Sequence, residues 1–355
     1  MDTEIFALDL GNKQTKLKSS KKTYILPSHF FDAENFGENF GVAKSNTHQR
    51  FQVPFSDSEY IWGTDIDALH LDNYMIDTLI RGNRYADESF KLLANFSLGL
   101  LANDFVESKE GILTVDVVTG IPSKDYFDKE RKQTLMDVLS GQHQIDIDQK
   151  TVTVKVKNVY IVPQPIGTLY NELLGSDGVT IKNENLMSDK IGVVDIGGGT
   201  ILIDTILNFR LIEDSSKQIN TGINDLYQSI ASSMNGEVSL YKIAETLRAG
   251  NKNQEWIYSY SRNNQINITE LVNKKINSFT RLQANKVNST LDDKQTIDTL
   301  LFTGGGSSLV NRKLILKTFN NAQFVEEPEL ANVLGFYKFG KNYTSENWGE
   351  YRWSY

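Results

Sequence analysis

The chain alternates short apolar runs with amphipathic stretches, and this pattern predicts its elements. Residues 4–10 are an apolar run that predicts a buried strand, and residues 15–18 alternate like the returning strand of a hairpin. The same pattern of strand, loop and strand recurs over residues 191–207. A third apolar run, residues 299–302, leads through glycines into a helix that we expect to begin at Ser307 and Ser308, a cap signal.

Two long stretches show the apolar spacing of helices. Residues 86–108 have acidic residues in their first turn and apolar residues along one face, and residues 266–291 open with a Thr/Glu start. Their apolar positions are Phe90, Leu93 and Leu100 in the first stretch, and Leu271, Val272, Ile276, Phe279 and Leu282 in the second. Strands are predicted at 112–120 and 151–162, each followed by proline and a helix. This alternation predicts an α/β protein.

Composition narrows the possible functions. The 355 residues are 39% hydrophobic and 23% charged, which suits a sizeable core divided between two domains. No apolar run is long enough for a membrane helix and no signal peptide is evident, so we expect a cytoplasmic protein that does not contact a membrane. Cysteine is absent, which excludes disulfides and thiolate chemistry. The net charge of −8, with no basic run, argues against direct DNA binding, so an action on DNA would need an adaptor.

Two aspartates and the glycines after them carry the candidate chemistry. Asp9 and Asp195 each lie at the end of an apolar strand, and each precedes a glycine-containing loop. Where no side chain intervenes, backbone N–H groups approach an anion closely, and phosphate is the usual anion. One such loop also suits a plain hairpin turn. Two loops, each beside a carboxylate, indicate phosphates with a hydrated Mg²⁺ between them and the carboxylates.

Several common nucleotide signatures are missing. The chain contains neither GxxxxGK[ST] nor GxGxxG, and it lacks the protein-kinase motifs. A P-loop or a dinucleotide fingerprint therefore does not explain its glycines. The third glycine row, at 304–306, precedes a predicted helix whose N-terminus could receive a nucleoside or its phosphates, and a structural turn is the alternative.

At these residues the chain resembles the actin, sugar-kinase and heat-shock-chaperone ATPase superfamily. That resemblance implies an α/β, actin-like (ribonuclease H-like) fold of two domains with a nucleotide cleft between them. Residues 9–16 (DLGNKQTK) are similar to the first phosphate hairpin, 195–200 (DIGGGT) to the second, and 302–308 (FTGGGSS) to the adenosine loop. Residues 162–175 (VPQPIGTLYNELLG) resemble the connecting segment in which actins carry a glutamine before a helix. Residues 117–127 and 328–340 are most similar to the bacterial plasmid-segregation group of ParM-like proteins.

The resemblance also implies roles for single residues. Asp9 and Asp195 would hold the water shell of Mg²⁺, Gln164 would orient the attacking water, and Lys16 would neutralise the phosphates. The other implied contacts come from the three loops: Gly11 and Asn12; Gly197, Gly198, Gly199 and Thr200; and Gly304, Gly305, Gly306 and Ser307, the last four toward the adenosine. Plain structural readings stay open for Lys16 as a solvated strand residue, Thr200 as a strand former and Gln164 as a helix-start residue.

The chain departs from the family pattern at two places. Leu202 stands where the chaperones usually have an aspartate, although Asp204 follows two positions later. Many plasmid-segregation relatives have an acidic residue where Gln164 stands.

Domain limits and function follow from the same resemblance. Domain I would comprise residues 1–163 and 328–355, with a small insertion or exposed subdomain at about 32–67, and domain II residues 164–327. The implied function is an ATPase, with GTP as an open alternative, that polymerises head to tail and segregates plasmid DNA through a DNA-bound, ParR-like adaptor at a plasmid centromere. A cell-shape or division actin and a small-molecule kinase of the superfamily are the alternatives.

The C-terminal residues are rich in aromatic side chains. This aromatic tail is expected to pack onto domain I, or else to contact an adaptor or a neighbouring subunit. Its aromatic residues are Tyr343, Trp348, Tyr351, Trp353 and Tyr355.

Overall fold

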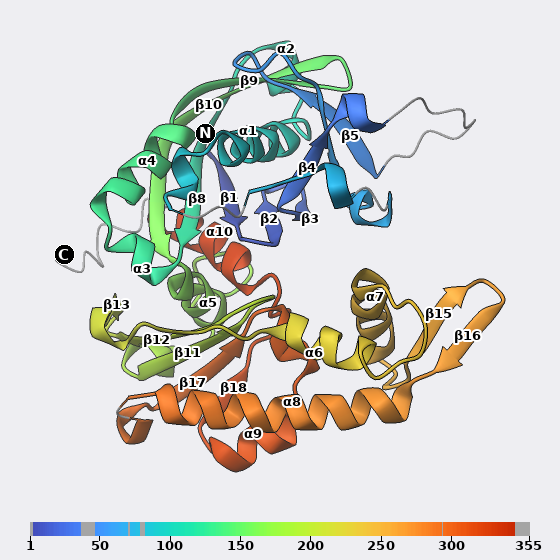
Figure 1. The fold of residues 1–355 in the computed structure, drawn as a ribbon. Helices are drawn as coiled ribbons and strands as arrows, with labels where there is room; N and C mark the ends of the chain where they lie inside the picture. Colours follow the sequence, from blue (N-terminus) through green and yellow to red (C-terminus); the bar gives the residue numbers. More distant parts are fainter. Residues whose placement is uncertain (1–2, 37–46, 70–71, 79–81, 293, 345–355) are drawn as a thin grey trace. The chain divides into compact units, whose positions relative to one another are not determined.

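The computed structural model describes residues 3–36, 47–69, 72–78, 82–292 and 294–344 (Figure 1). Contacts between Cα atoms divide the chain into two compact units, residues 1–182 with 332–355 and residues 183–331. Each unit combines a sheet with helices, as the predicted α/β class requires. The limits expected for the two actin-like domains stay a prediction.

Of the aromatic tail, only Tyr343 lies within the described residues. Its ring packs on the ring of Tyr160, with 5.0 Å between the two centroids.

One mixed sheet forms the centre of the first unit. Its β1 pairs parallel with β8, which pairs parallel with β10, and antiparallel strands complete both sides. In spatial order the strands are β3 (Thr23–Pro27), β2 (Gln14–Lys18), β1 (Glu4–Leu10), β8 (Leu113–Ile121), β10 (Lys150–Pro163), β9 (Gly141–Ile147), β5 (His48–Gln52), β6 (Tyr60–Gly63), β4 (His29–Asp32) and β7 (Met75–Asp77).

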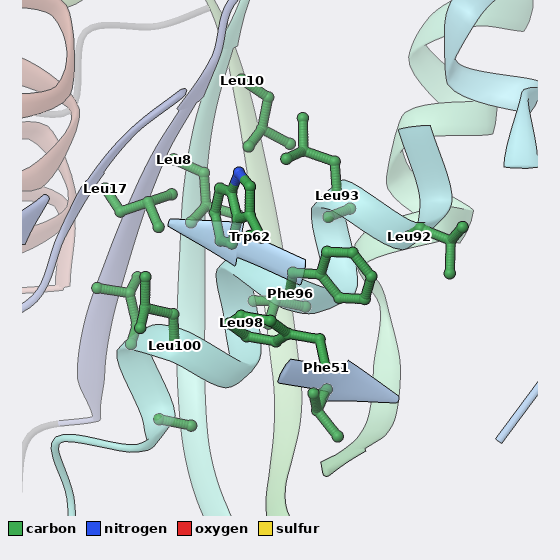
Figure 2. Close-up of a cluster of buried hydrophobic side chains, with 14 of the residues drawn as sticks. Leu8, Leu10, Leu17, Phe51, Trp62, Leu92, Leu93, Phe96, Leu98 and Leu100 are labelled. Atoms are coloured by element: carbon green, nitrogen blue, oxygen red, sulfur yellow. The ribbon is translucent and has the colours of Figure 1, made fainter. Parts of the chain in front are cut away.

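Helix α1 (Glu88–Ala102) packs an apolar face against this sheet. Its N-terminus is capped by Asp87, whose carboxylate accepts a hydrogen bond from the Ser89 N–H over 2.9 Å. Figure 2 shows Leu93 and Phe96 of α1 gathered around Trp62 of β6 in the buried cluster. The other helices of this unit are α2 (Glu107–Glu110), α3 (Ser123–Tyr126), α4 (Lys129–Leu139), α5 (Gln164–Leu173) and α10 (Ala331–Thr344).

Two predictions for the first unit need correction. The helix expected over 86–108 ends at Ala102, because the chain turns at 103–106 and the Ser108 hydroxyl donates to the Ala102 carbonyl over 2.6 Å. The segment expected as an exposed insertion instead contributes β5 and β6 to the sheet, where Phe51, Ile61 and Trp62 are buried. In β5 the polar Arg50 and Gln52 flank the buried Phe51, whereas β6 is buried throughout, so the polar composition of the whole segment did not reveal these two strands. Residues 37–46 of that segment lie outside the described residues.

The second unit repeats the central motif of the first. Here β11 pairs antiparallel with β12 and parallel with β17, as β1 pairs with β2 and β8. The predicted repeat of strand, loop and strand is therefore confirmed. The strands are β13 (Arg210–Leu211), β12 (Ile201–Leu207), β11 (Lys190–Ile196), β17 (Thr299–Thr303) and β18 (Ala322–Phe324) in spatial order, with β14 (Lys217–Ile219) also on β12, and a separate hairpin of β15 (Ile257–Ser261) and β16 (Asn264–Asn267).

Helices cover the second sheet, and Figure 1 shows α8 running along it with α9 beside it. The helices are α6 (Ile223–Ala231), α7 (Leu240–Asn251), α8 (Thr269–Thr290) and α9 (Arg312–Thr318). Short 3₁₀ turns complete the described elements at 33–36, 66–69, 72–74, 84–86, 184–187, 213–215, 294–296 and 305–309. None of the helices in the described ranges has the length and apolar character needed to cross a bilayer.

Three details of the second unit differ from prediction. The long helix begins at Thr269 because residues 264–267 pair with β15. Leu282, expected on its apolar face, is 51% exposed. No α-helix begins at the serines: Ser307 and Ser308 donate their hydroxyls back to the carbonyls of Gly304 and Gly305, and the next helix, α9, is capped by Asn311 instead. The two hydroxyls thus bond to carbonyls behind them, and no N–H group of the described residues donates to either one.

Candidate functional site

The first glycine loop, residues 11–13, joins β1 to β2 directly after Asp9. Asp9 is 3% exposed, and its Oδ2 lies 3.7 Å from Lys16 Nζ. The two residues are opposite each other in the hairpin ladder, so the pairing of β1 with β2 brings the cation to the carboxylate. A Cβ atom at Gly11 would lie 2.7 Å from the Gln14 carbonyl oxygen, which explains why this turn carries a glycine. Asp9 and Lys16 thus form a partly buried ion pair beside the loop.

Helix α5 brings a third predicted residue to this pair. Gln164 is its first residue, and Gln164 Nε2 donates to Asp9 Oδ1 over 3.3 Å. The helix is fixed from behind by α10, because Gly167 and Gly335 pack so closely that a Cβ at Gly335 would lie 1.7 Å from the Gly167 carbonyl oxygen. Asp9, Lys16 and Gln164 are therefore grouped within the first unit.

The second glycine loop, residues 197–200, joins β11 to β12. The Gly197 and Gly198 carbonyls accept the N–H groups of Ile223 and Asn224 over 3.0 and 2.9 Å at the start of α6. With those carbonyls turned toward the helix, the N–H groups of Gly198 and Gly199 donate to no backbone carbonyl of the described residues. Unpaired N–H groups in a glycine row are suited to hold an anion.

The two hairpins differ at one position of chemical importance. In the β11–β12 ladder, Leu202 lies opposite Asp195, where Lys16 lies opposite Asp9 in the first hairpin. The second carboxylate therefore lacks the ladder lysine that the first one has. Asp204, the other carboxylate noted in this hairpin, is buried and accepts a hydrogen bond from the Ser216 hydroxyl over 2.7 Å.

The third glycine loop, residues 304–308, follows β17 and lies against Asp195. Gly304 has φ +81°, and a Cβ there would lie 2.2 Å from Asp195 Oδ1. Glycine is required by both conformation and space. A Cβ at Gly306 would likewise meet the Ile196 side chain at 2.5 Å, whereas the nearest atom to a Cβ at Gly305 would be Glu329 Cγ, at 3.7 Å. The Ser307 side chain is buried and donates to the Gly304 carbonyl, so it fixes the turn.

One residue beside the first loop was not anticipated from the sequence. Arg84 Nη1 donates to Asn12 Oδ1 over 2.5 Å, and Arg84 Nη2 lies 3.4 Å from the Gly11 carbonyl oxygen. Burial lowers the pKa of the Arg84 guanidinium, against the raising effects of Tyr85, Asp125, Asp77 and Asp9. No local sequence signal identifies this residue, because 72 positions separate it from Asn12.

The aspartates beside the glycine loops, each considered within its own unit, suit a hydrated magnesium ion better than a cage of protein ligands would. Within the described ranges, no group of three or more His, Asp or Glu residues could hold a metal ion. Mg²⁺ is usually bound through one or two carboxylates, its own waters and substrate phosphates, and it requires no such cluster. The buried Asp9 and the Asp195 carboxylate beside Gly304 are carboxylates of the kind this mode of binding uses.

Two family models match the chain, one in each half. The model for the N-terminal domain of actin-like proteins matches residues 7–167, and the model for the C-terminal part of archaeal actin homologues, MreB-like, matches residues 193–315. No protein in the curated set matches the chain.

Solved structures match over nearly the whole length. The apo pSK41 ParM protein is 25% identical, with a TM-score of 0.74, and the match covers 97% of this chain and 99% of that one. An archaeal actin homologue, Ta0583, in complex with ADP is 16% identical (TM-score 0.73, covering 96% and 99%). A 15-stranded ParM filament from Clostridium botulinum is 19% identical (TM-score 0.66, covering 96% and 99%). These matches confirm the predicted fold class.

Proposed function

We propose that this chain, which belongs to the actin-like ATPase superfamily and is similar to ParM proteins, polymerises into nucleotide-dependent filaments that segregate plasmid DNA. The observation that carries the proposal is the match to pSK41 ParM over 97% of the chain, together with a glycine loop that follows a strand-end aspartate in each unit. The ADP in an archaeal actin homologue and the ParM filament support the nucleotide and the polymer, respectively.

In this proposal each unit supplies one loop to the phosphates of ATP or GTP. N–H groups of the second glycine loop donate to phosphate oxygens, and Lys16 adds a positive charge at the first loop. Asp9 and Asp195 hold the water shell of Mg²⁺, which when bound neutralises the charge that develops on the phosphates. Gln164 orients the attacking water, and the third loop receives the adenosine. Such a site needs positioning rather than a covalent nucleophile, which agrees with a chain without cysteine.

Polymerisation follows from a head-to-tail surface that only one nucleotide state presents. A heterologous contact that does not close on itself produces an open filament. Loss of the γ-phosphate removes contacts and shifts the population toward another conformation, which lets the filament disassemble. The net charge of −8 makes direct capture of DNA unfavourable, so we assign the link to DNA to a small ParR-like adaptor bound at the plasmid centromere.

Sedimentation and light scattering test this function directly. Wild-type protein at tens of micromolar with Mg²⁺ and ATP, GTP or a slowly hydrolysed analogue should pellet and scatter light. With ATP or GTP it should return to the supernatant as the nucleotide is consumed, whereas with the analogue it should stay in the pellet. Asp9→Ala should abolish both signals, whereas Asp137→Asn, an exposed carboxylate on α4, should leave them unchanged. A wild-type protein that binds no purine triphosphate, or binds it and stays in the supernatant with every analogue, would contradict the proposal.

A further inference from the structure

Arg84 is fixed between the first glycine loop and an aromatic side chain. Its Nη1 donates to Asn12 Oδ1 and its Nη2 to Thr78 Oγ1, over 2.5 and 3.3 Å. Its Cζ lies 4.9 Å from the centre of the Phe90 ring on α1, so the planar guanidinium rests on an aromatic face. A lysine could not reproduce this arrangement, because only the guanidinium presents several N–H groups in one rigid plane.

Within the part of the chain that the structure describes, no counter-ion contacts the positive charge of Arg84. Among the described residues, no carboxylate lies within 4.0 Å of its guanidinium nitrogens, and the buried Nε has no hydrogen-bond partner. The three carboxylates that influence it electrostatically are each closer to another cation: Asp9 to Lys16 (3.7 Å), Asp77 to Lys13 (3.0 Å) and Asp125 to Arg131 (2.5 Å). Burying a cation without a partner is unfavourable, so the arrangement favours an anionic ligand nearby.

The hydrogen bond to Asn12 also fixes the direction of that side chain. An asparagine amide has one acceptor side and one donor side. Because Asn12 Oδ1 accepts from Arg84, the Nδ2 group is turned to the other side, and it donates to none of the described residues. Two N–H donors are thereby held on the loop that also carries the turn glycine, Gly11.

We propose that Arg84 is a positioning residue for nucleotide phosphates at the first glycine loop. It holds the Gly11 carbonyl and the Asn12 amide so that Asn12 Nδ2 donates to a phosphate oxygen, and its unpaired charge adds to the attraction for the anion. This inference rests on the proposed function, because it names a residue that sets the affinity of the same nucleotide site. Arg84 acts through Asn12 and is not itself assigned to the reacting atoms.

A double-mutant cycle on the full-length chain tests the coupling. The dissociation constants of fluorescent ADP and of a slowly hydrolysed ATP analogue, each with Mg²⁺, are measured for wild type, Arg84→Met, Asn12→Ala and the double variant. Each single substitution should weaken binding about 10- to 100-fold. Because both act through one contact, the double variant should bind about as weakly as the weaker single variant. Arg84→Met keeps an unbranched side chain against Phe90, which limits the effect of lost packing.

Two further variants separate positioning from folding. Arg131→Met removes a neighbouring ion-paired arginine that does not contact the loop, and it should bind nucleotide like wild type. Arg84→Lys keeps the positive charge but loses the planar guanidinium that donates to Asn12 and Thr78, so it should still weaken nucleotide binding several-fold. If Arg84→Met does not fold, Arg84→Lys tests the positioning role instead. Additive losses in the cycle, or wild-type affinity in a folded Arg84 variant, would overturn the inference. Failure of the wild-type protein to bind nucleotide would instead overturn the proposed function.

Discussion

Gln164 Nε2 donates a hydrogen bond to Asp9 Oδ1 over 3.3 Å, which joins the start of α5 to the end of β1. Since the amide nitrogen faces the carboxylate, the amide oxygen of Gln164 is directed elsewhere and is available to accept a proton of water. The same contact is compatible with a purely structural role, in which Gln164 only holds the helix against Asp9. Measurements of turnover and of binding distinguish these two roles.

Replacing Gln164 by alanine should slow nucleotide hydrolysis about 100-fold, because a water that is misplaced near the phosphate reacts slowly. Nucleotide affinity should stay within a few-fold of wild type, since the loops and Lys16 remain in place. Phosphate release in single-turnover experiments, with binding measured separately, checks both expectations. Gln133→Ala, on the exposed side of α4, is the matched control. Unchanged turnover in Gln164→Ala would assign Gln164 to structure alone.

Gly304→Ala should weaken binding of Mg²⁺–nucleotide at least about 10-fold, because a left-handed φ is costly for alanine and its Cβ would meet the Asp195 carboxylate. Calorimetric titration measures the affinity, and thermal melting shows whether the unit remains folded. Ser308→Ala, at an exposed position of the same turn, should bind nucleotide normally. Wild-type affinity in Gly304→Ala would show that Asp195 can move without loss.

The two hairpins that carry the candidate site residues depend on local pattern, and the sequence predicted them correctly. Asp9 and Asp195 could be found because an apolar strand, a carboxylate and a glycine turn are adjacent in the chain, and the hairpins β1–β2 and β11–β12 follow from short-range alternation. Gln164 could be assigned only through the family resemblance, because its contact with Asp9 spans 155 positions.

Features set by tertiary packing could not be predicted in the same way. No local sequence pattern identifies Arg84 as a site residue, because only the fold brings it to Asn12. The strands β5 and β6 look polar and turn-rich, although Phe51 and Trp62 are buried in the sheet. At Ser307 the sequence offered a plausible helix cap, but the hydroxyl bonds back to Gly304, and the cap of the following helix comes from Asn311. In each case a contact distant in sequence or a competing local hydrogen bond decided the structure.

Gly335→Ala should destabilise the first unit by about 1–3 kcal/mol, because the added methyl group would overlap the Gly167 carbonyl and force α10 away from α5. Urea unfolding measured without nucleotide gives the difference in free energy. Gly199→Ala, whose Cβ would meet no atom within 4 Å, controls for the general effect of replacing glycine by alanine. Equal stability of wild type and Gly335→Ala would contradict the close contact between these helices.

Lys338 fixes the C-terminal end of α5, and its replacement should make stability depend differently on pH. Its Nζ donates to the carbonyls of Asn171 and Leu174 and to Asn171 Oδ1, each over 2.9 Å. Burial, and secondarily the Lys182 charge, lower the Lys338 pKa from 10.5 to about 8, while Glu172 and Asp177 act in the opposite direction. Lys338→Met should be less stable than wild type by about 1 kcal/mol near neutral pH, since the helix carbonyls lose their donor.

The pH dependence of this difference has a definite sign. Between about pH 8 and 10.5 the unfolded chain holds a proton on Lys338 that the folded chain has released, so the free energy of unfolding of wild type should rise with pH relative to Lys338→Met. Below about pH 8 both states are protonated and the difference should be constant. Urea unfolding of the two proteins at a series of pH values measures it, with Lys341→Met, an exposed position on the same helix, as control. A difference that falls as pH rises would mean that the carbonyl oxygens stabilise the ammonium more than burial disfavours it, which reverses the direction of the pKa shift.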